Sequence, residues 1–358
     1  MKRLFALFVT FMITIGLYGC GSPEEVQPEE QIDYEIAMIT DSGLIMNGGY
    51  SEVAWNTISE FGASEGISHK YYKAVEPSDD SYRQAIDSAV QGGAKIVIAD
   101  GYLFSQAIYE KQNQYPDVKF VIIDAVPADA ESGETKVGKN TVEVTFSSEQ
   151  AGYLAGYGAV MDGMTQLGFM GDDKKPLIMD YGYGFLQGAE KAAEEQGVSV
   201  KVNYHYCTDD DDRDSIIEKS NQWYGAGTEA IFACGNTVEQ PVIESAEILN
   251  KKVIAYETDK SQMSDTVVTS SVKDIESALK TVLEQYKDDK FPGGSTVKYD
   301  IANDGIWLEI ENGKLENLDK SDYNDIIKNI KDGNIKVKRY DSGNISSLAL
   351  SNVQVIEQ

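Results

Sequence analysis

The segment Phe146–Gly163 reads FSSEQAGYLAGYGAVMDG, a strand end that runs into a helix rich in small residues. Gly152, Gly156 and Ala159 recur at spacings of four and three residues, so they fall on one stripe of that helix. Because the stripe carries almost no side chain, another part of the chain can approach the helix backbone closely. We expect the segment to mark a crossing between two lobes.

Short β-rich runs alternate with amphipathic segments on both sides of this helix. Before it, we expect strands at 34–40, 69–75, 94–100 and 119–125, and helices at 50–62, 81–91 and 103–113. After it, we expect strands at 167–171, 199–206, 229–235 and 252–258, and helices at 184–196, 214–225 and 239–250. This alternation is typical of α/β proteins whose parallel sheets carry helices on both faces.

The repeated series predicts two similar parallel-sheet lobes joined by hinge crossovers. A strand at 266–273 and helices at 275–286 and 321–331 follow the second series, so the chain crosses between lobes more than once. We assign residues 34–146 plus about 272–295 to the first lobe, and 147–271 plus about 296–358 to the second. Ligands of open parallel sheets lie beyond the carboxyl ends of the strands, so facing lobes predict a cleft that closes on a small molecule.

The N-terminus indicates export. Two basic residues precede an apolar run at 4–17, which has the length of a signal-peptide core. The run ends in Tyr-Gly-Cys20, which resembles a bacterial lipobox. We expect a signal peptide at 1–19, a lipidated Cys20 opening an acidic linker at 20–33, and a protein anchored to the extracytoplasmic face of the cell membrane. An uncleaved anchor, or ordinary cleavage beside a chance cysteine, are the alternatives.

Composition narrows the function classes. The chain has 358 residues, 42% of them hydrophobic, which suffices for a sizeable core and favours two domains over one. Lys and Arg number 31 against 59 Asp and Glu, a net charge of -28 that disfavours nucleic-acid binding. Besides Cys20, the chain has Cys207 and Cys234, which are either buried free thiols or a disulfide.

Motifs for catalysis or metal binding are nearly absent. The sequence lacks GxSxG, HExxH and P-loop motifs, and no GxGxxG follows the first strand. His69 and His205 lie in strand-like runs and are expected to be structural. The aspartates at 209–212 with Asp214 lack EF-hand spacing and are interpreted as a solvated turn with a helix N-cap. We therefore expect no enzyme activity, cofactor or metal.

Several segments together carry a family resemblance: ITDSG (39–43) with Tyr50 and Trp55, GGAKIVIADGY (92–102), YPDVKFVIID (115–124), FSSEQAGYLAGYGAVM (146–161), VIAYETDK (253–260), SSVK (270–273) and IKDGNIKVKRYD (330–341). Over essentially its full mature length the chain resembles the basic membrane protein family of lipoproteins, the purine nucleoside receptors of ABC importers. The resemblance implies a periplasmic-binding-protein type I fold, a nucleoside enclosed between the lobes, a membrane permease as partner, and a monomer.

The resemblance also implies ligand-binding residues. Asp41 stands where a family carboxylate meets the base edge, although from the sequence alone turn capping is an equal alternative. Tyr50 replaces a stacking Phe, although from the sequence alone a core aromatic at a helix start is the alternative. Tyr206, or else Cys207 or Thr208, matches a second stacking position.

Two further matches concern the sugar. Glu257 replaces an Asp that suits a ribose diol, and Lys273 matches a Lys that reaches the ligand. An ordinary surface Glu or Lys is the alternative for both positions.

The chain departs from the family at three loops. The loop at 44–51 is apolar and Gly-rich where the family carries charge, with Asn47 as its polar ligand-binding candidate. Asn236 stands in a turn that is Gly-rich in the family and is expected to donate to the ligand. Ser105 and Gln106 follow Gly101-Tyr102 where a carboxylate is expected, so neutral groups are expected to recognise the base.

Two alternatives keep the fold and change the function. The same cleft can bind a sugar or another small polar metabolite. The protein can also be an extracytoplasmic sensor whose closed form engages a signalling partner.

Overall fold

The computed structural model of the protein describes residues 33–41, 45, 48–208, 210–340 and 345–358. The expected signal peptide, Cys20 and Asn47 lie outside these residues. Residues 33–358 belong to one structural unit. None of the helices in the described part of the chain is long and apolar enough to cross a membrane.

The first sheet has six strands in the order β11-β5-β4-β3-β1-β2, all parallel to their neighbours. Its strands are β1 (Ile36–Thr40), β2 (His69–Lys73), β3 (Ile96–Asp100), β4 (Lys119–Ile123), β5 (Thr141–Phe146) and β11 (Ser295–Tyr299). Its helices are α1 (Tyr50–Glu65), α2 (Asp79–Gln91), the short η1 (Tyr102–Phe104), α3 (Ser105–Gln114) and α8 (Ile275–Lys287). The strands and helices expected before residue 146 are confirmed.

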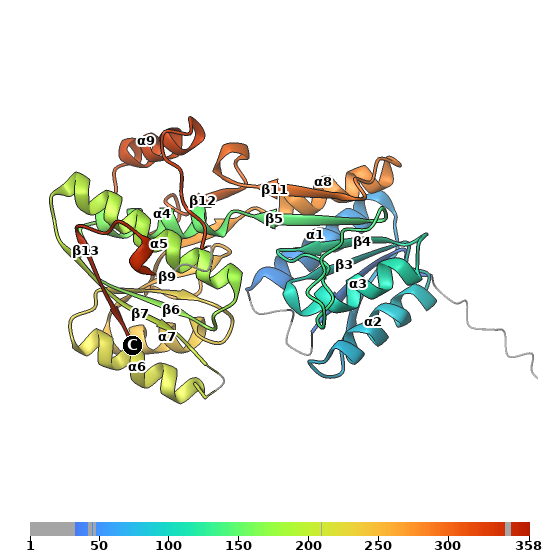
Figure 1. Ribbon diagram of the computed structural model, residues 1–358, viewed down its shortest axis with the longest axis horizontal. Coiled ribbons are helices and arrows are strands. Elements are labelled where there is room, and N and C mark those ends of the chain that lie inside the picture. The colour runs from blue at the N-terminus through green and yellow to red at the C-terminus, as the bar shows by residue number, and fades with distance from the viewer. Residues whose placement is uncertain (1–32, 42–44, 46–47, 209, 341–344) are drawn as a thin grey trace, which may run out of the picture. The chain divides into compact units, whose positions relative to one another are not determined.

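Alternation along the strands decides which helix covers which face. Ile36 and Met38 of β1 join a core cluster that includes α1 and α8, whereas Ala37 and Ile39 join a cluster with α2 and α3. Successive strand residues point to opposite faces, so a fully apolar strand requires helices on both sides. Figure 1 shows α2 and α3 together beside β3 and β4.

The second sheet has seven strands in the order β12-β10-β9-β8-β6-β7-β13, parallel except for the antiparallel pair β10 and β12. Its strands are β6 (Gln166–Gly171), β7 (Val200–Tyr206), β8 (Ala230–Cys234), β9 (Lys252–Glu257), β10 (Val267–Lys273), β12 (Ile306–Leu308) and β13 (Val353–Glu357). The remaining helices are α4 (Ser148–Met161), α5 (Pro176–Gln196), α6 (Arg213–Gly225), α7 (Glu239–Leu249), η2 (Ile301–Asn303), α9 (Lys320–Lys331) and η3 (Ile345–Ser347). Helix α5 begins at Pro176 instead of 184, because proline fits the first helical turn.

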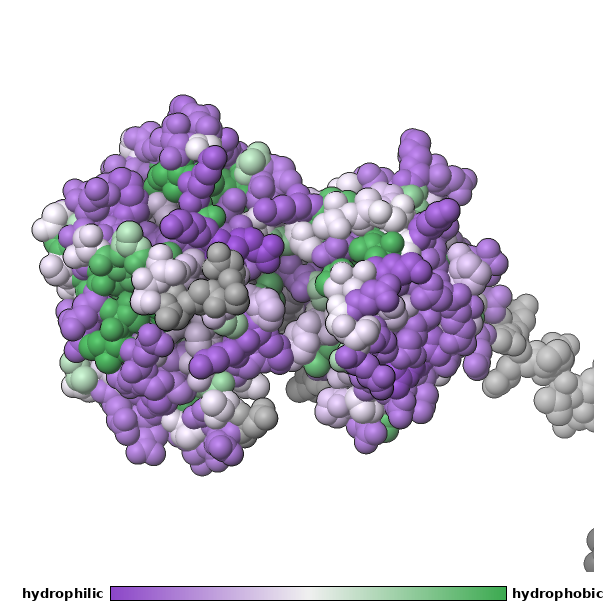
Figure 2. Space-filling model, in the orientation of Figure 1, coloured by the Kyte–Doolittle hydropathy of each residue, from purple (hydrophilic) through white to green (hydrophobic). Residues whose placement is uncertain are grey.

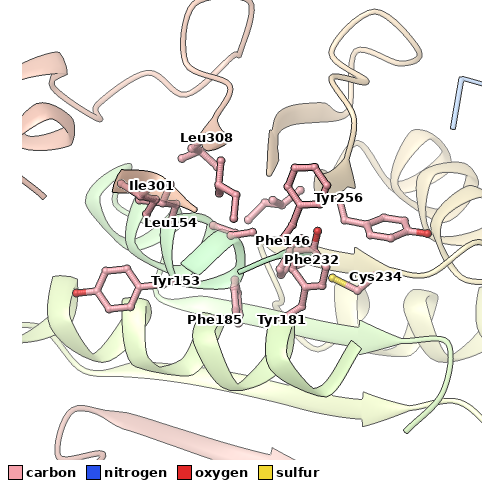
Figure 3. Packing of buried hydrophobic residues seen from close by; sticks show 14 of the residues in the cluster. Phe146, Tyr153, Leu154, Tyr181, Phe185, Phe232, Cys234, Tyr256, Ile301 and Leu308 are labelled. Carbon is pink, nitrogen blue, oxygen red and sulfur yellow. The ribbon is translucent and has the colours of Figure 1, made fainter. Parts of the chain in front are cut away.

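Helices α4 and α5 cross at backbone contact. A Cβ built on Gly152 or Gly156 of α4 would lie 2.0 Å from the carbonyl oxygen of Tyr181 or Phe185 of α5. Gly184 and Gly188 of α5 meet α4 in the same way, so each helix contributes glycines four residues apart. Figure 3 shows Phe185 and Tyr181 packed under α4. The small-residue stripe therefore joins two helices over the second sheet, whereas the passage from the first sheet lies just before it, between Phe146 and Ser148.

The chain leaves the first sheet after β5, returns to its side after β10, and leaves it again after β11. Helix α8 packs against α1, and β11 pairs with β5, so both belong with the first sheet. The sequence-based division ended this insertion at about residue 295, and the pairing of Ser295–Tyr299 extends it through β11. Strand β11 is too short for its sequence alone to show that it pairs with β5 of the first sheet.

The structure also bears on two expectations from composition, the state of Cys207 and Cys234 and the polarity of the surface. Cys207 and Cys234 are both buried and free, so the alternative of a disulfide is wrong. Figure 2 shows a face that is mainly hydrophilic, as expected for a chain with 25% charged residues.

Candidate ligand-binding site

A cavity of about 310 Å³ lies at the carboxyl ends of strands from both sheets. From the first sheet it is lined by Ile39, Thr40, Asp41, Gly49, Tyr50, Ser51, Asp100, Gly101, Tyr102, Leu103, Phe104 and Asp124. From the second it is lined by Asp172, Asp173, Lys175, Leu177, Ile178, Gly235, Asn236, Tyr256 and Glu257. At these strand ends the chain leaves the sheet and continues as loops. Side chains on such loops are available to contact a ligand.

Four residues expected from the sequence meet in this cavity. Asp41 follows β1, Tyr50 opens α1, Asn236 follows β8, and Glu257 ends β9. The Asn236 side-chain oxygen accepts a hydrogen bond from the Tyr256 hydroxyl at 2.8 Å, which fixes its amide. The structure thus brings together, in one cavity, side chains that are up to 216 residues apart in sequence (257 minus 41).

Tyr50 is held as a rigid aromatic group. Its side chain is buried and its ring packs edge-on to Phe146, with 6.4 Å between centroids. Burial, followed by the charges of Asp124 and Asp100, raises the pKa of Tyr50 well above its ordinary value. The hydroxyl therefore stays protonated, and no hydrogen-bond partner for it occurs in the described part of the chain.

Lys273 lies behind the cavity wall and is not one of its lining residues. Its ammonium group is 2.6 Å from Asp124 Oδ2 and 3.6 Å from Glu257 Oε1, and its side chain is fully buried. Burial raises the pKa of Glu257, and the lysine opposes that rise. Lys273 therefore offsets the charge of two carboxylates that line the cavity.

Both carboxylates adopt an unusual backbone conformation. Asp124 has φ 52° and Glu257 has φ 65°, in the left-handed region that non-glycine residues seldom occupy. Asp124 Oδ1 accepts a hydrogen bond from the Phe146 amide at 3.0 Å, and its Oδ2 holds Lys273. Strained backbone of this kind persists where surrounding contacts impose it, and it is frequent at binding sites.

Asp100 and Asp172 are functional candidates that sequence reasoning missed. Burial raises the pKa of Asp100 to about 8, reinforced by the charge of Glu257 and opposed by a hydrogen bond from Ser51. Burial and the charge of Asp173 raise the pKa of Asp172 to about 7. Acidic side chains from neighbouring strand ends therefore line the cavity close to Gly101 and Tyr102, and the expectation that neutral groups recognise the base stays a prediction.

These missed residues share a sequence signal. Asp100, Asp124 and Asp172 stand at or directly after an apolar strand, as Asp41 and Glu257 do. Applying the strand-end rule to every strand would have found them.

Tyr206 is not brought into the cavity. Its hydroxyl bonds to that of Tyr204 at 2.6 Å, and its ring packs edge-on to Phe169. It ends β7, near the edge of its sheet, where only β13 lies further out. Tyr256 and Tyr102 line the cavity instead and provide aromatic surface from the second and the first sheet.

Polar contacts join the two sides of the site. Lys175, before α5, hydrogen-bonds to the Tyr102 hydroxyl and lies 3.9 Å from the centroid of its ring. The Thr258 hydroxyl donates to the Gly48 carbonyl oxygen at 3.0 Å. Residues of the two sheets therefore contact one another at the cavity.

Carboxyl groups outnumber basic groups in the lining of the cavity. Its described residues include the carboxyl groups of Asp41, Asp100, Asp124, Asp172, Asp173 and Glu257, and the ammonium group of Lys175. Carboxylates accept hydrogen bonds from hydroxyl and amino groups, and aromatic rings offer flat apolar surface. The cavity suits a neutral or cationic ligand with several donors and a flat ring, and it repels anions.

Comparisons with known proteins agree with this architecture. The ABC transporter nucleoside-binding protein BmpA of Lactococcus lactis subsp. cremoris is 25% identical over 88% of this chain and 93% of its own length. Basic membrane protein D of Borreliella burgdorferi is 25% identical over 88% of each chain. A solute-binding protein structure from Conexibacter woesei matches with TM-score 0.67 and 17% identity over 86% of this chain and 99% of its own, which supports the expected periplasmic-binding-protein type I fold. Residues 34–341 match the profile of PnrA-like ABC transporter substrate-binding proteins, so the chain belongs to this family, Bmp.

Proposed function

We infer that this substrate-binding protein captures a nucleoside of the purine class and delivers it to an ABC permease. The observation that carries the inference is the cavity's combination of aromatic and carboxyl groups. Tyr50, Tyr102 and Tyr256 offer ring surface to a base, while Asp124 and Glu257 offer acceptors to sugar hydroxyls. The nucleoside-binding name of the Lactococcus relative supports the same ligand class.

The mechanism requires binding and release without chemistry on the ligand. A ligand that contacts both sides of the cavity favours the closed arrangement over the open one, because only the closed form makes both sets of contacts. The permease would then recognise the closed form. Tyr102 with Lys175, and Thr258 with Gly48, are contacts that support this arrangement.

A thermal-shift and calorimetry panel tests the ligand class. Adenosine, guanosine, inosine, uridine, ribose and xylose are added separately to the full chain, and purine nucleosides are expected to raise the melting temperature most. Larger shifts with the free sugars would overturn the nucleoside assignment and favour the sugar alternative. Turnover of any nucleoside would contradict a purely binding role.

Matched variants test the assigned roles. Tyr50→Leu should weaken nucleoside binding by about 10-fold or more, since it removes the ring, whereas Tyr50→Phe should bind nearly as well as the parent. Glu257→Gln should weaken nucleoside binding more than binding of the free base, because its partner is the sugar. Glu247→Gln, an exposed acidic residue, is the control.

We also infer that Cys20 anchors the protein to the outer face of the cell membrane. Metabolic labelling with a fatty acid should mark the parent and not Cys20→Ser, and equal labelling would contradict the anchor.

Cross-linking in cells separates the importer from the sensor alternative: a permease partner supports transport, and a membrane kinase supports sensing.

A further inference from the structure

A second cluster of polar side chains lies at the end of β7, outside the ligand cavity. His205 is near the end of the strand, Cys207 follows it, and Asp211 lies in the turn before α6. One ligand atom of each residue, the imidazole nitrogen, the thiol sulfur and a carboxylate oxygen, lies within 4.8 Å of the other two. His205 Nε2 and Asp211 Oδ2 are 3.8 Å apart, too far for a hydrogen bond.

The imidazole of His205 uses only one of its two ring nitrogens in a hydrogen bond within the described residues. Its side chain is 10% exposed, and Nδ1 lies 2.6 Å from the backbone oxygen of Gln358. That contact assigns the proton to Nδ1 and leaves the Nε2 lone pair facing Cys207 and Asp211. Nε2 is itself buried and has no hydrogen-bond partner in the described part of the chain. A buried acceptor without a partner is costly, so an occupant of the cluster would relieve that cost.

The other two groups are held in place by their surroundings. Asp211 Oδ2 accepts hydrogen bonds from the Thr208 amide at 2.8 Å and the Thr208 hydroxyl at 3.0 Å. The Cys207 amide donates to the Gly171 carbonyl oxygen at 2.8 Å, which continues the pairing of β7 with β6. Contacts that orient the ligating groups in this way are typical of metal sites.

We propose that His205, Cys207 and Asp211 bind one Zn²⁺ ion through Nε2, Sγ and a carboxylate oxygen. Zinc accepts this mixture of nitrogen, sulfur and oxygen donors, whereas Ca²⁺ and Mg²⁺ require oxygen ligands. Tetrahedral zinc places its donor atoms about 3.3–3.7 Å from one another. The three donor atoms lie within 4.8 Å of one another, so zinc binding would require them to move closer by side-chain rotation. Three protein ligands leave a fourth position for water or an external group.

Metal binding replaces the proton of the Cys207 thiol with the metal ion. Burial, with the charges of Asp211 and Asp172, raises the pKa of Cys207 to about 12, so the metal-free thiol is protonated at neutral pH. Zinc binds the thiolate and releases that proton to solvent, and no redox step is involved. The metal charge would also lie near Asp172 and lower the repulsion among the acidic groups there.

Cobalt substitution provides the direct test. The full chain, without an affinity tag, is freed of metal with a chelator, dialysed and titrated with Co²⁺. Coordination as proposed gives visible absorption typical of tetrahedral cobalt and a thiolate-to-cobalt charge-transfer band, and one equivalent of Zn²⁺ removes both. Absence of the charge-transfer band in the parent would overturn the proposal without reliance on any variant.

Matched variants locate the metal. Cys207→Ser should abolish the charge-transfer band, whereas Cys234→Ser and Cys20→Ser should retain it. His205→Gln and Asp211→Asn should lower zinc affinity at least about 10-fold, while His69→Gln and Asp210→Asn should leave it unchanged. Circular dichroism checks that each variant is folded. If the parent and folded Cys207→Ser retain zinc equally, the proposal is contradicted. It is also contradicted if Cys234→Ser or Cys20→Ser loses the charge-transfer band while Cys207→Ser keeps it.

Discussion

Lys273 Nζ lies 2.6 Å from Asp124 Oδ2, and this ion pair joins β10 of the second sheet to the end of β4 in the first, beneath the ligand cavity. Glu257 is the second carboxylate near the same ammonium group, at 3.6 Å. Removing the cation leaves two buried negative charges close together, which is much less favourable than the loss of an exposed pair.

Lys273→Met should therefore lower the free energy of unfolding by about 3–5 kcal/mol at neutral pH. Lys287→Met, which breaks the exposed pair with Glu65, should cost less than about 1 kcal/mol and is the matched control. Urea unfolding monitored by circular dichroism measures both. Equal effects of the two substitutions would show that the buried pair is unimportant for stability.

Gly156→Ala tests the crossing of α4 and α5. The added Cβ would lie 2.0 Å from the Phe185 carbonyl oxygen, so the helices must separate, and we expect a loss of about 1–3 kcal/mol. Gly225→Ala has nothing within 4 Å of its added Cβ and should be neutral or slightly stabilising. Thermal melting compares them. A Gly156→Ala protein that melts with the parent would contradict close packing, and a change confined to ligand selectivity would place Gly156 in the binding site instead.

The buried Asp100 makes stability depend on pH. Its folded-state pKa of about 8 exceeds the ordinary 3.8, so the folded protein binds more protons and stability falls as pH rises from about 4 to about 8. Asp100→Asn mimics the protonated form. Its unfolding free energy should exceed that of the parent by an amount that grows by more than about 1 kcal/mol between pH 5 and pH 8. Urea unfolding at both pH values, with exposed Glu131→Gln as control, measures the difference. A difference independent of pH would contradict the raised pKa.

Tyr102→Phe removes the hydroxyl that bonds to Lys175 and keeps the ring. If this contact stabilises the closed form, ligand should dissociate about 3–10-fold faster with little change in association rate. Stopped-flow fluorescence measures both rates, and Tyr71→Phe, on the exposed side of β2, serves as control. Slower association with unchanged dissociation would assign Tyr102 to ligand entry.

The sequence alone determined the alternation of strands and helices, because fully apolar strands and amphipathic segments report burial directly. Comparison with the family that the sequence resembles also supplied Asp41, Tyr50, Asn236 and Glu257 as ligand-binding candidates, and all four line the cavity. The family resemblance supplied the ligand class as a hypothesis.

Tertiary structure alone decided which distant strand ends meet. Tyr206 lies against Tyr204 and away from the cavity, and Lys273 lies behind the residues that line it. Asp100 and Asp172 are themselves lining residues of the cavity. It also brought His205 and Cys207, five and seven residues beyond Val200, together with Asp211 across a turn. Periodicity fixes the face on which a side chain lies, but strand order and loop path fix its neighbours, and these depend on contacts far apart in the chain.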